Sequence, residues 1–142
     1  MKEIDEKELK TAIEKAFAAR QFSYVPYSNF RVGACLVTTD GEMISGCNIE
    51  NSSFSATNCA ERTAIFKAIL EGKRNFKYIV IVGGKDGTDD FDFCPPCGVC
   101  RQVMTEFCDL HEFYIVLAKS VDEYKIFSLD EIIPFSFNKN HL

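Results

Sequence analysis

The feature that most constrains the fold is an unbroken apolar run near the middle of the chain, Tyr78-Ile79-Val80-Ile81-Val82. A strand with one face in water alternates apolar and polar side chains, so a continuous run predicts a strand that is covered on both faces. Residues 113–118 are similar and predict a second buried strand. Because covering both faces requires helices on both sides of the sheet, the chain is expected to be an α/β protein.

The helical spacing of apolar residues predicts the covering layers. An amphipathic helix is expected over 5–20, and two more are expected after Asn58 and from about Cys97, the first of them capped by Asn58 and ended by Gly72. The other expected elements are strands at 30–38 and 42–48 around a turn at 39–41, a loop at 83–93, an edge strand at 124–127 and a short helix opened by the capping box 128–131. Together they predict a single three-layer α-β-α domain over residues 1–142, with a mixed central sheet.

Charge and hydropathy exclude several classes of function. The chain has 142 residues and a formal net charge of -5, a balance that disfavours binding to nucleic acid or to anionic membranes. No apolar run approaches the roughly 20 residues that a membrane helix needs. Residues 1–7 are mostly charged and have no apolar stretch behind them, which argues against a secretory signal. We therefore expect a cytoplasmic protein with no membrane or nucleic-acid partner.

The seven cysteines are unusual, and because their number is odd they cannot all pair with one another. In a reducing compartment such a set indicates metal binding, redox catalysis or core packing. Cys35, Cys47 and Cys108 fall in expected strands or in a helical stripe, where a thiol behaves as a small apolar residue. The cysteines left for chemistry are Cys59, Cys94, Cys97 and Cys100.

Three of these four lie where an expected helix begins. Cys59 takes the first position of the second helix, and Cys97 and Cys100 span the start of the third. The free amides and the dipole at a helix N-terminus stabilise a thiolate, and helices that follow the strands of one sheet begin at the same edge. Three thiolates that converge there would bind zinc and leave its fourth tetrahedral position open, as catalytic rather than structural zinc sites do.

Charged residues beside these cysteines fit such a centre. Glu61 follows Cys59 by two residues, so its carboxylate can take a proton from zinc-bound water, whose pKa the metal lowers towards ~7. Arg62 and Arg101 flank the cysteines, and hydrogen bonds from them to sulfur would offset the negative charge of three thiolates on a dication. Asn58-x-x-Glu61 is also a capping-box pattern, but the neighbouring cysteines favour the proton-transfer role.

Four segments carry a pattern that can be recognised as a whole. Two of them contain Cys59-Ala60-Glu61 and Pro96-Cys97-Gly98-Val99-Cys100, which match the signature of zinc-dependent nucleobase deaminases. The four segments are Pro26-Tyr27-Ser28-Asn29-Phe30-Arg31-Val32-Gly33-Ala34, Gly46-Cys47-Asn48-Ile49-Glu50-Asn51, Cys59-Ala60-Glu61-Arg62-Thr63-Ala64 and Pro96-Cys97-Gly98-Val99-Cys100-Arg101-Gln102. With them the chain resembles the small homotetrameric cytidine deaminases, from about Leu9 to Phe137.

The resemblance implies both a fold and a reaction. The fold is the cytidine deaminase-like α/β fold, and the reaction is the hydrolytic deamination of cytidine and 2'-deoxycytidine to the uridines, with release of ammonia, in pyrimidine salvage. The resemblance implies that Cys59, Cys97 and Cys100 hold one catalytic Zn²⁺ per chain. Glu61 would carry the proton from the bound water to the ring nitrogen and then to the leaving amine.

The resemblance also implies contacts to the substrate and between subunits. Phe30 would stack on the base, Asn48 and Glu50 would hold the ribose hydroxyls, and Ala60 would contact the substrate. Phe137 would reach over the substrate of a neighbouring subunit. The implied partners are therefore a nucleoside, water and further copies of the chain in a homotetramer.

Two places depart from the family's pattern. Phe54 stands where relatives often have tyrosine, so a contact through that phenol is absent. The loop at 83–93 looks longer and more acidic than is usual in the family. Such a loop either alters access to the site or is simply solvated.

Alternatives that use the same cysteines differently stay open at this point. A thiol–disulfide oxidoreductase built on Cys97 and Cys100 would leave Cys59 without a role. A ferredoxin-type cluster is excluded because Met104 stands at the next ligand position. Cys94 could complete a closed four-sulfur zinc site, but such a site would be inert.

Two further alternatives share the deaminase chemistry but act on other substrates. Enzymes that deaminate cytosine in polynucleotides use basic grooves and aromatic platforms, which an acidic chain without tryptophan does not suggest. Antibiotic nucleosides are a closer possibility, but Asn48-Ile49-Glu50 favours an ordinary ribose. A free nucleoside is therefore the expected substrate.

Overall fold

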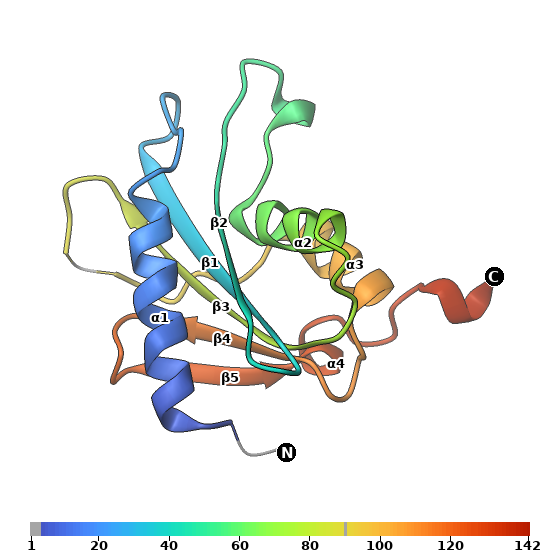
Figure 1. The fold of residues 1–142 in the computed structure, drawn as a ribbon. Helices are drawn as coiled ribbons and strands as arrows, with labels where there is room; N and C mark the ends of the chain where they lie inside the picture. Colours follow the sequence, from blue (N-terminus) through green and yellow to red (C-terminus); the bar gives the residue numbers. More distant parts are fainter. Residues whose placement is uncertain (1–3, 90) are drawn as a thin grey trace.

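The computed structural model describes residues 4–89 and 91–142, and its strands form one five-stranded sheet (Figure 1). The strands are β1 (Phe30–Thr38), β2 (Met43–Cys47), β3 (Phe76–Lys85), β4 (Tyr114–Ala118) and β5 (Tyr124–Ser128). Their order in the sheet is β2-β1-β3-β4-β5. Strand β3 pairs antiparallel with β1 and parallel with β4, and both outer pairs are antiparallel, so the sheet is mixed as expected.

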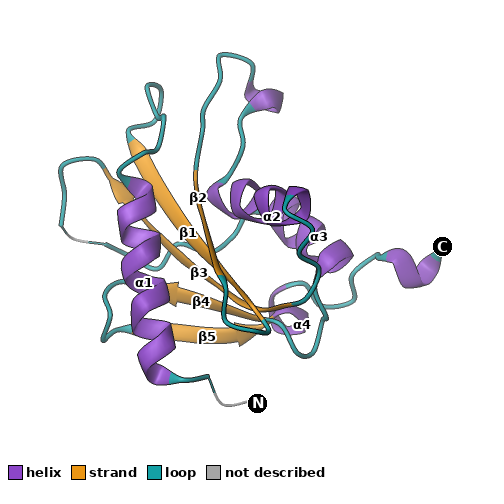
Figure 2. Ribbon diagram, in the orientation of Figure 1, coloured by secondary structure: helices purple, strands orange, loops and turns teal. Residues whose placement is uncertain are grey.

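Helices cover both faces of this sheet, as Figure 2 shows by type of element. One face is covered by α1 (Glu6–Arg20), and the other by α2 (Ala60–Leu70), α3 (Gly98–Phe107) and the short α4 (Leu129–Ile132). Two apolar cores result, one on each side of the sheet. The expected three-layer α-β-α arrangement is confirmed.

Strand β3 shows why both layers are needed. Tyr78, Val80 and Val82 join the core beneath α1, whereas Ile79 and Ile81 join the core beneath α2 and α3. All five side chains are fully buried, as the unbroken apolar run predicts. Because side chains alternate along β3, Gly83 lies on the same side as Ile79 and Ile81, the side of α2 and α3. The three cysteines lie on this side too.

Two glycines let the helices approach the sheet closely. A Cβ on Gly33 of β1 would lie 1.9 Å from the carbonyl oxygen of Ala16 in α1. A Cβ on Gly46 of β2 would lie 2.4 Å from the carbonyl oxygen of Ala60 and 2.5 Å from the amide nitrogen of Ala64, both in α2. The start of α2 is therefore pressed directly onto the sheet, which fixes its position relative to β2.

Several local expectations are confirmed and others are wrong. The capping box that opens α4 is present, with Ser128 and Glu131 bonding to each other's backbone amides, and Gly72 takes a positive φ of 84° just after α2. The loop expected at 83–93 is wrong in its first part, because β3 continues to Lys85 along β1. Two short 3-10 helices, Phe54–Ala56 and Lys139–His141, were not expected.

Residues 1–3, from the charged start, and residue 90, from the acidic loop, lie outside the described residues. None of the helices in 4–89 and 91–142 is long and apolar enough to cross a bilayer.

Candidate active site

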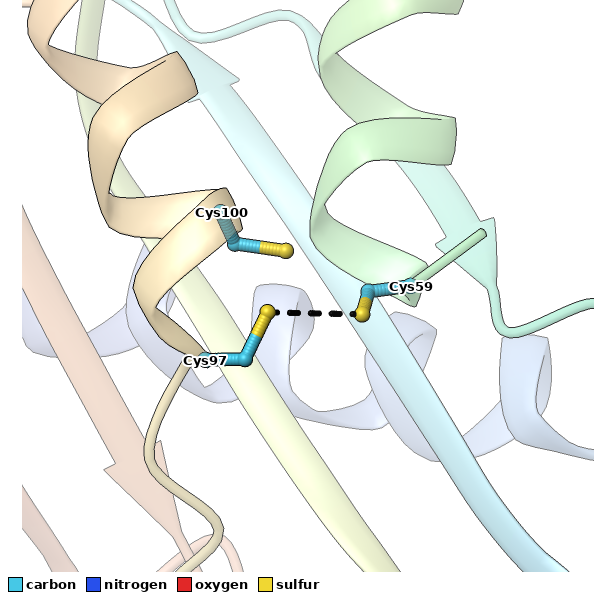
Figure 3. Close-up of side chains that lie close together, drawn as sticks. All are labelled: Cys59, Cys97 and Cys100. Carbon is cyan, nitrogen blue, oxygen red and sulfur yellow. Dashed lines mark hydrogen bonds between the residues drawn. The ribbon is translucent and has the colours of Figure 1, made fainter. Parts of the chain in front are cut away.

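The three cysteines at the expected helix starts meet between the first turns of α2 and α3 (Figure 3). Cys59 is the N-cap residue of α2, Cys97 is the N-cap residue of α3, and Cys100 lies in the first turn of α3. Their sulfur atoms all lie within 4.8 Å of one another, and the Sγ atoms of Cys59 and Cys97 are 3.6 Å apart. Helix α2 thus begins one residue later than expected, and Asn58 is not its cap but donates from Nδ2 to Thr63 Oγ1 at 3.0 Å.

This sulfur geometry fits a tetrahedral metal ion. Zinc–sulfur bonds of about 2.3 Å place two ligand sulfurs about 3.8 Å apart, close to the 3.6 Å between Cys59 and Cys97. The Cys100 thiol holds the pKa of Cys59 below its ordinary value by hydrogen bonding, as do Arg62 and Cys97, which favours the metal-binding thiolate. Within the described residues this is the one group of three histidine, cysteine or acidic side chains close enough to share an ion.

The two arginines of the motif differ in what they contact. Arg62 donates from Nη2 to Cys59 Sγ at 3.4 Å, as expected for a residue that offsets the charge of the thiolates. Its Nε atom is buried and has no hydrogen-bond partner in the structure. Arg101 does not follow the expectation of a bond to sulfur: it donates to the carbonyl oxygens of Pro96 at 2.8 Å and Ile132 at 2.6 Å. Arg101 therefore braces the backbone just before Cys97 against α4.

Glu61 is buried in the first turn of α2, with only 3% of its surface exposed. Burial raises the pKa of this carboxyl to about 7, and the negative charge of Cys59 acts in the same direction. A carboxyl that titrates near neutrality can both accept and release a proton at physiological pH. The structure shows no side-chain cap at the start of α2, so the capping role considered for Glu61 is not observed.

The residues expected to hold the ribose, Asn48 and Glu50, are hydrogen-bonded to the start of β1 and to the loop before it. Asn48 accepts from the amide of Val32 and donates to the carbonyl oxygen of Phe30, both at 2.9 Å, so it fixes the start of β1. Its amide group has a second N–H to offer a ligand. These bonds also place the backbone of Phe30, whose ring is half-buried on the α2–α3 side of the sheet.

The carboxylate of Glu50 is held by hydrogen bonds from the loop before β1. It accepts from the amides of Tyr27 at 3.0 Å and Ser28 at 3.1 Å, and also from the Ser28 hydroxyl. These hydrogen bonds, that of the Ser28 hydroxyl above all, lower the pKa of Glu50 below its ordinary value. Glu50 and Phe54 both line a cavity of about 390 Å³. The motif segment contains Ser28, but its role as the partner of Glu50 was not predicted, because it depends on a contact across 22 residues of sequence.

Phe137 lies in a C-terminal tail that projects away from the sheet (Figure 1). Its ring is 62% exposed and stacks on His141 at 5.3 Å, and its carbonyl oxygen accepts from Gln102 Nε2 at 2.9 Å. Phe135 in the same tail is fully exposed. The structure thus presents the aromatic tail outward, while Gln102 ties it to the helix that carries Cys97 and Cys100.

The undecided cysteine, Cys94, is not part of the sulfur cluster. Its sulfur packs over Gly83 of β3, where an added Cβ would lie 2.9 Å from it. Burial, together with the charges of Glu61 and Cys59, raises the pKa of this thiol to about 12. The closed four-sulfur site is therefore not observed. Cys35 is buried, and Cys47 and Cys108 are half-buried, within or beside the elements where core packing was expected.

Comparison with known proteins now places the chain in a family. Residues 6–117 match the model described as "Cytidine and deoxycytidylate deaminase zinc-binding region". The chain belongs to this family of zinc-binding deaminases, and it is therefore a hydrolytic enzyme. The resemblance seen in the sequence is confirmed.

Individual relatives agree with this assignment. A cytidine deaminase from Sporosarcina psychrophila is 41% identical over 135 residues, which cover 95% of each chain. One from Halalkalibacterium halodurans is 44% identical over 125 residues, covering 88% of this chain and 90% of its own length. The crystal structure of a cytidine deaminase from Burkholderia pseudomallei superposes with a TM-score of 0.80 at 43% identity, covering 89% of this chain and 97% of that chain.

Proposed function

We propose that this enzyme hydrolyses cytidine and 2'-deoxycytidine to uridine and 2'-deoxyuridine, with release of ammonia. The observation that carries the proposal is the convergence of three cysteine sulfurs within 4.8 Å of one another, with the carboxyl of Glu61 buried in the first turn of α2, directly after Cys59 and Ala60. The hydrolysis of an aromatic amine requires activated water and a group that transfers protons. Three thiolates would hold a metal with one position free for water, and the neighbouring carboxyl can transfer the protons. Membership of the deaminase family supports this reading.

In this proposal Cys59, Cys97 and Cys100 hold one zinc ion per chain. When bound, zinc would supply a positive centre that makes water acidic enough to attack at neutral pH. Glu61 accepts the proton of the attacking water, passes a proton to ring nitrogen N3, and later delivers one to the departing amine. Arg62 keeps the charge of Cys59 compensated. The bond from carbon C4 to the amine breaks, and water supplies the oxygen of the product.

The remaining residues bind and orient the nucleoside. Phe30 offers a flat apolar face to the flat base, and Asn48 and Glu50 offer an amide and a carboxylate to the sugar hydroxyls. Ala60 is the first residue of α2, where a backbone N–H has no acceptor within the helix and can donate to the substrate. Held in this way, the base presents its amine-bearing carbon to Glu61 and the sulfur cluster.

We further propose that the enzyme works as a homotetramer in the cytoplasm, in pyrimidine salvage, with residues 1–142 as one domain. Support for the assembly comes from apolar side chains that the described chain leaves largely uncovered, among them Phe22, Phe54, Phe135 and Leu142. Exposed apolar groups of this size are typical of surfaces that bind another protein. Phe137 would then complete a neighbouring subunit's site.

A substrate panel combined with one substitution tests the proposal. We expect wild type to release ammonia from cytidine and deoxycytidine, but not from cytosine, adenosine or single-stranded DNA, and to contain about one zinc per chain. Glu61→Gln should retain zinc and thermal stability but lose at least about 100-fold in turnover, because the amide cannot carry a proton. Glu71→Gln, at the exposed end of the same helix, is the matched control and should behave as wild type. A metal-free protein, or Glu61→Gln with near-normal turnover, would contradict this mechanism.

A further inference from the structure

Three residues from separate parts of the chain meet beside the candidate active site. Gly83 continues the side of β3 on which Ile79 and Ile81 face α2 and α3, because side chains alternate along a strand. An added Cβ on Gly83 would lie 2.9 Å from Cys94 Sγ and 3.1 Å from Cε1 of Phe30. Cys94 and the edge of the Phe30 ring thus cover Gly83 together, on the same side of the sheet as the sulfur cluster.

The segment that carries Cys94 is fastened at two aromatic rings. Phe91 packs edge-on against Phe17 at 5.4 Å, and the guanidinium of Arg20 lies 4.6 Å from the centre of its ring. The ammonium groups of Lys119 and Lys125 lie 4.8 and 4.7 Å from the centre of the Phe93 ring. Cys94 follows directly, so its place beside Phe30 is fixed by contacts on either side of the loop.

A cavity of about 430 Å³ opens beside this contact. Phe30, Gly83 and Cys94 all line it, and Lys85, Thr88 and Asp92 are among its other lining residues. The ring of Phe30, which is proposed to stack on the base, therefore borders this cavity. A substituent on the base that pointed towards Cys94 would have room there.

The orientation of the base follows from the proposed function, on which this inference rests. Glu61 lies in α2 and delivers a proton to N3, so the N3 edge of the ring faces α2. Ring atom C5 is bonded to C4 on the side away from N3, so it points away from α2. Cys94 covers Gly83 beside the ring of Phe30, on which the base is proposed to stack. We propose that Cys94 is a specificity-determining residue that faces C5 of the pyrimidine, and that the cavity beside it admits cytidines with a small C5 substituent.

Steady-state kinetics with cytidine and 5-methylcytidine test this directly. Hydrolysis of 5-methylcytidine yields 5-methyluridine and ammonia, so one assay serves both substrates. Wild type should accept both, and Cys94→Leu, whose side chain extends towards C5, should lower the ratio of kcat/KM for 5-methylcytidine to that for cytidine. A steric change of one or two carbons in such a pocket corresponds to about 10- to 200-fold. Cys94→Ala should leave the ratio at or above its wild-type value.

The controls separate this inference from the proposed function and from misfolding. Cys47→Leu makes the same substitution in the groove between α1 and α2 and should leave the ratio unchanged. If Cys94→Leu lost zinc, Cys94→Val would be measured in its place, and it should shift the ratio in the same direction. No activity of wild type on any cytidine would overturn the proposed function itself. Activity on cytidine but not 5-methylcytidine, or a ratio unaffected by the Cys94 substitutions at full zinc content, would overturn the role of Cys94 alone.

Discussion

At the scale of single residues, the two arginines of the motif show that equal charge does not mean equal function. Arg62 reaches a cluster sulfur at 3.4 Å, whereas Arg101 is committed to two backbone carbonyl oxygens. A guanidinium beside a thiolate stabilises the charged sulfur that a metal needs, while one bound to carbonyls stabilises a backbone conformation. The electrostatic support of the sulfur cluster in this chain therefore comes from Arg62.

Substitution of Arg62 should reveal this role in metal affinity. Removing the partner of a metal ligand typically costs about 10- to 100-fold in affinity, so Arg62→Ala should release zinc at a lower chelator concentration than wild type. Competition with a chromogenic chelator measures the shift. Arg74→Ala removes the same charge from an arginine that donates to the carbonyls of Ile69 and Lys73, and should not change zinc affinity. Equal affinities in all three proteins would show that Arg62 does not support the cluster.

The hydrogen bond between Ser28 and Glu50 should make the thermal stability of the protein depend on pH. Hydrogen bonds from the Ser28 hydroxyl and backbone hold the folded-state pKa of Glu50 below its ordinary value of 4.5. The stability that these bonds contribute is therefore present above pH 4.5 and lost as the pH falls through the lowered pKa. Ser28→Ala should have a lower Tm than wild type at pH 6, and the difference should narrow below about pH 4.

Thermal unfolding between pH 3 and pH 7 measures that difference. Glu50→Gln provides the control, because without an ionisable group the Ser28→Ala substitution should have the same effect at every pH. A Tm difference between wild type and Ser28→Ala that stayed constant with pH would refute the coupling.

At the scale of elements, the position of α2 depends on the absence of one side chain. Gly46 of β2 allows the first turns of α2 to lie directly on the strand. Because Cys59 and Glu61 sit at this end of α2, the contact between a glycine and a helix sets the height of both residues above the sheet.

Gly46→Ala should therefore impair both the fold and the site. The new Cβ would meet backbone atoms at 2.4 and 2.5 Å, so α2 must move, and overpacking of this kind typically costs about 1–3 kcal/mol of unfolding free energy. Denaturant unfolding and zinc content measure the two effects. Gly98→Ala, at the first residue of α3 with nothing within 4 Å of its Cβ, should not lose stability. Wild-type stability of Gly46→Ala would contradict the close contact.

The elements also show what local sequence can and cannot predict. The buried strands, the three long helices and the capping box of α4 follow from apolar spacing and from cap residues that lie close together in the chain. The end of β3 was not predictable in this way, since Gly83 and Gly84 disfavour a strand on their own. Both are strand residues here because they pair with Val32 and Arg31 of β1. Both are glycines because Phe30 with Cys94 and, at Gly84, Phe91 occupy the space that side chains would need.

The same distinction applies to the site. The motif spacing predicts that Cys59, Cys97 and Cys100 converge, because each is tied to the start of a helix at one sheet edge. It does not predict which arginine meets sulfur, since that choice depends on the carbonyl of Ile132, 31 residues away from Arg101. Contacts that join distant segments are decided by packing and not by local pattern.

At the scale of the whole molecule, the exposed C-terminal tail is the feature that bears on the proposed assembly. Phe137 is carried outward on a segment that Gln102 attaches to α3, and Lys139 adds a second bond, to the carbonyl of Glu106 at 3.2 Å. The backbone of the tail is thus attached to α3 while the ring of Phe137 stays exposed, so the ring is free to contact a neighbouring copy of the chain. This arrangement supports the proposal that complete sites exist only in the assembly.

Complementation between inactive variants tests that proposal. Phe137→Ala should retain zinc but lose activity, and Glu61→Gln should be inactive for a different reason. Co-expressed subunits that carry one substitution each should regain activity, because an intact Glu61 would then receive Phe137 from a neighbour. Co-expression of Glu61→Gln with wild type gives the reference for subunit mixing. Mixed oligomers that remain inactive, or an active wild-type monomer at high dilution, would exclude a shared site.

The distance between the cysteines along the chain has a consequence for folding. Cys59 and Cys97 are 38 residues apart, and the chain between them forms all of α2 and all of β3. A cross-link that closes a loop of this length removes chain entropy from the unfolded state worth about 4 kcal/mol. An ion bound by these sulfurs would act as such a cross-link, so its binding would form the reactive centre and stabilise the fold in the same step.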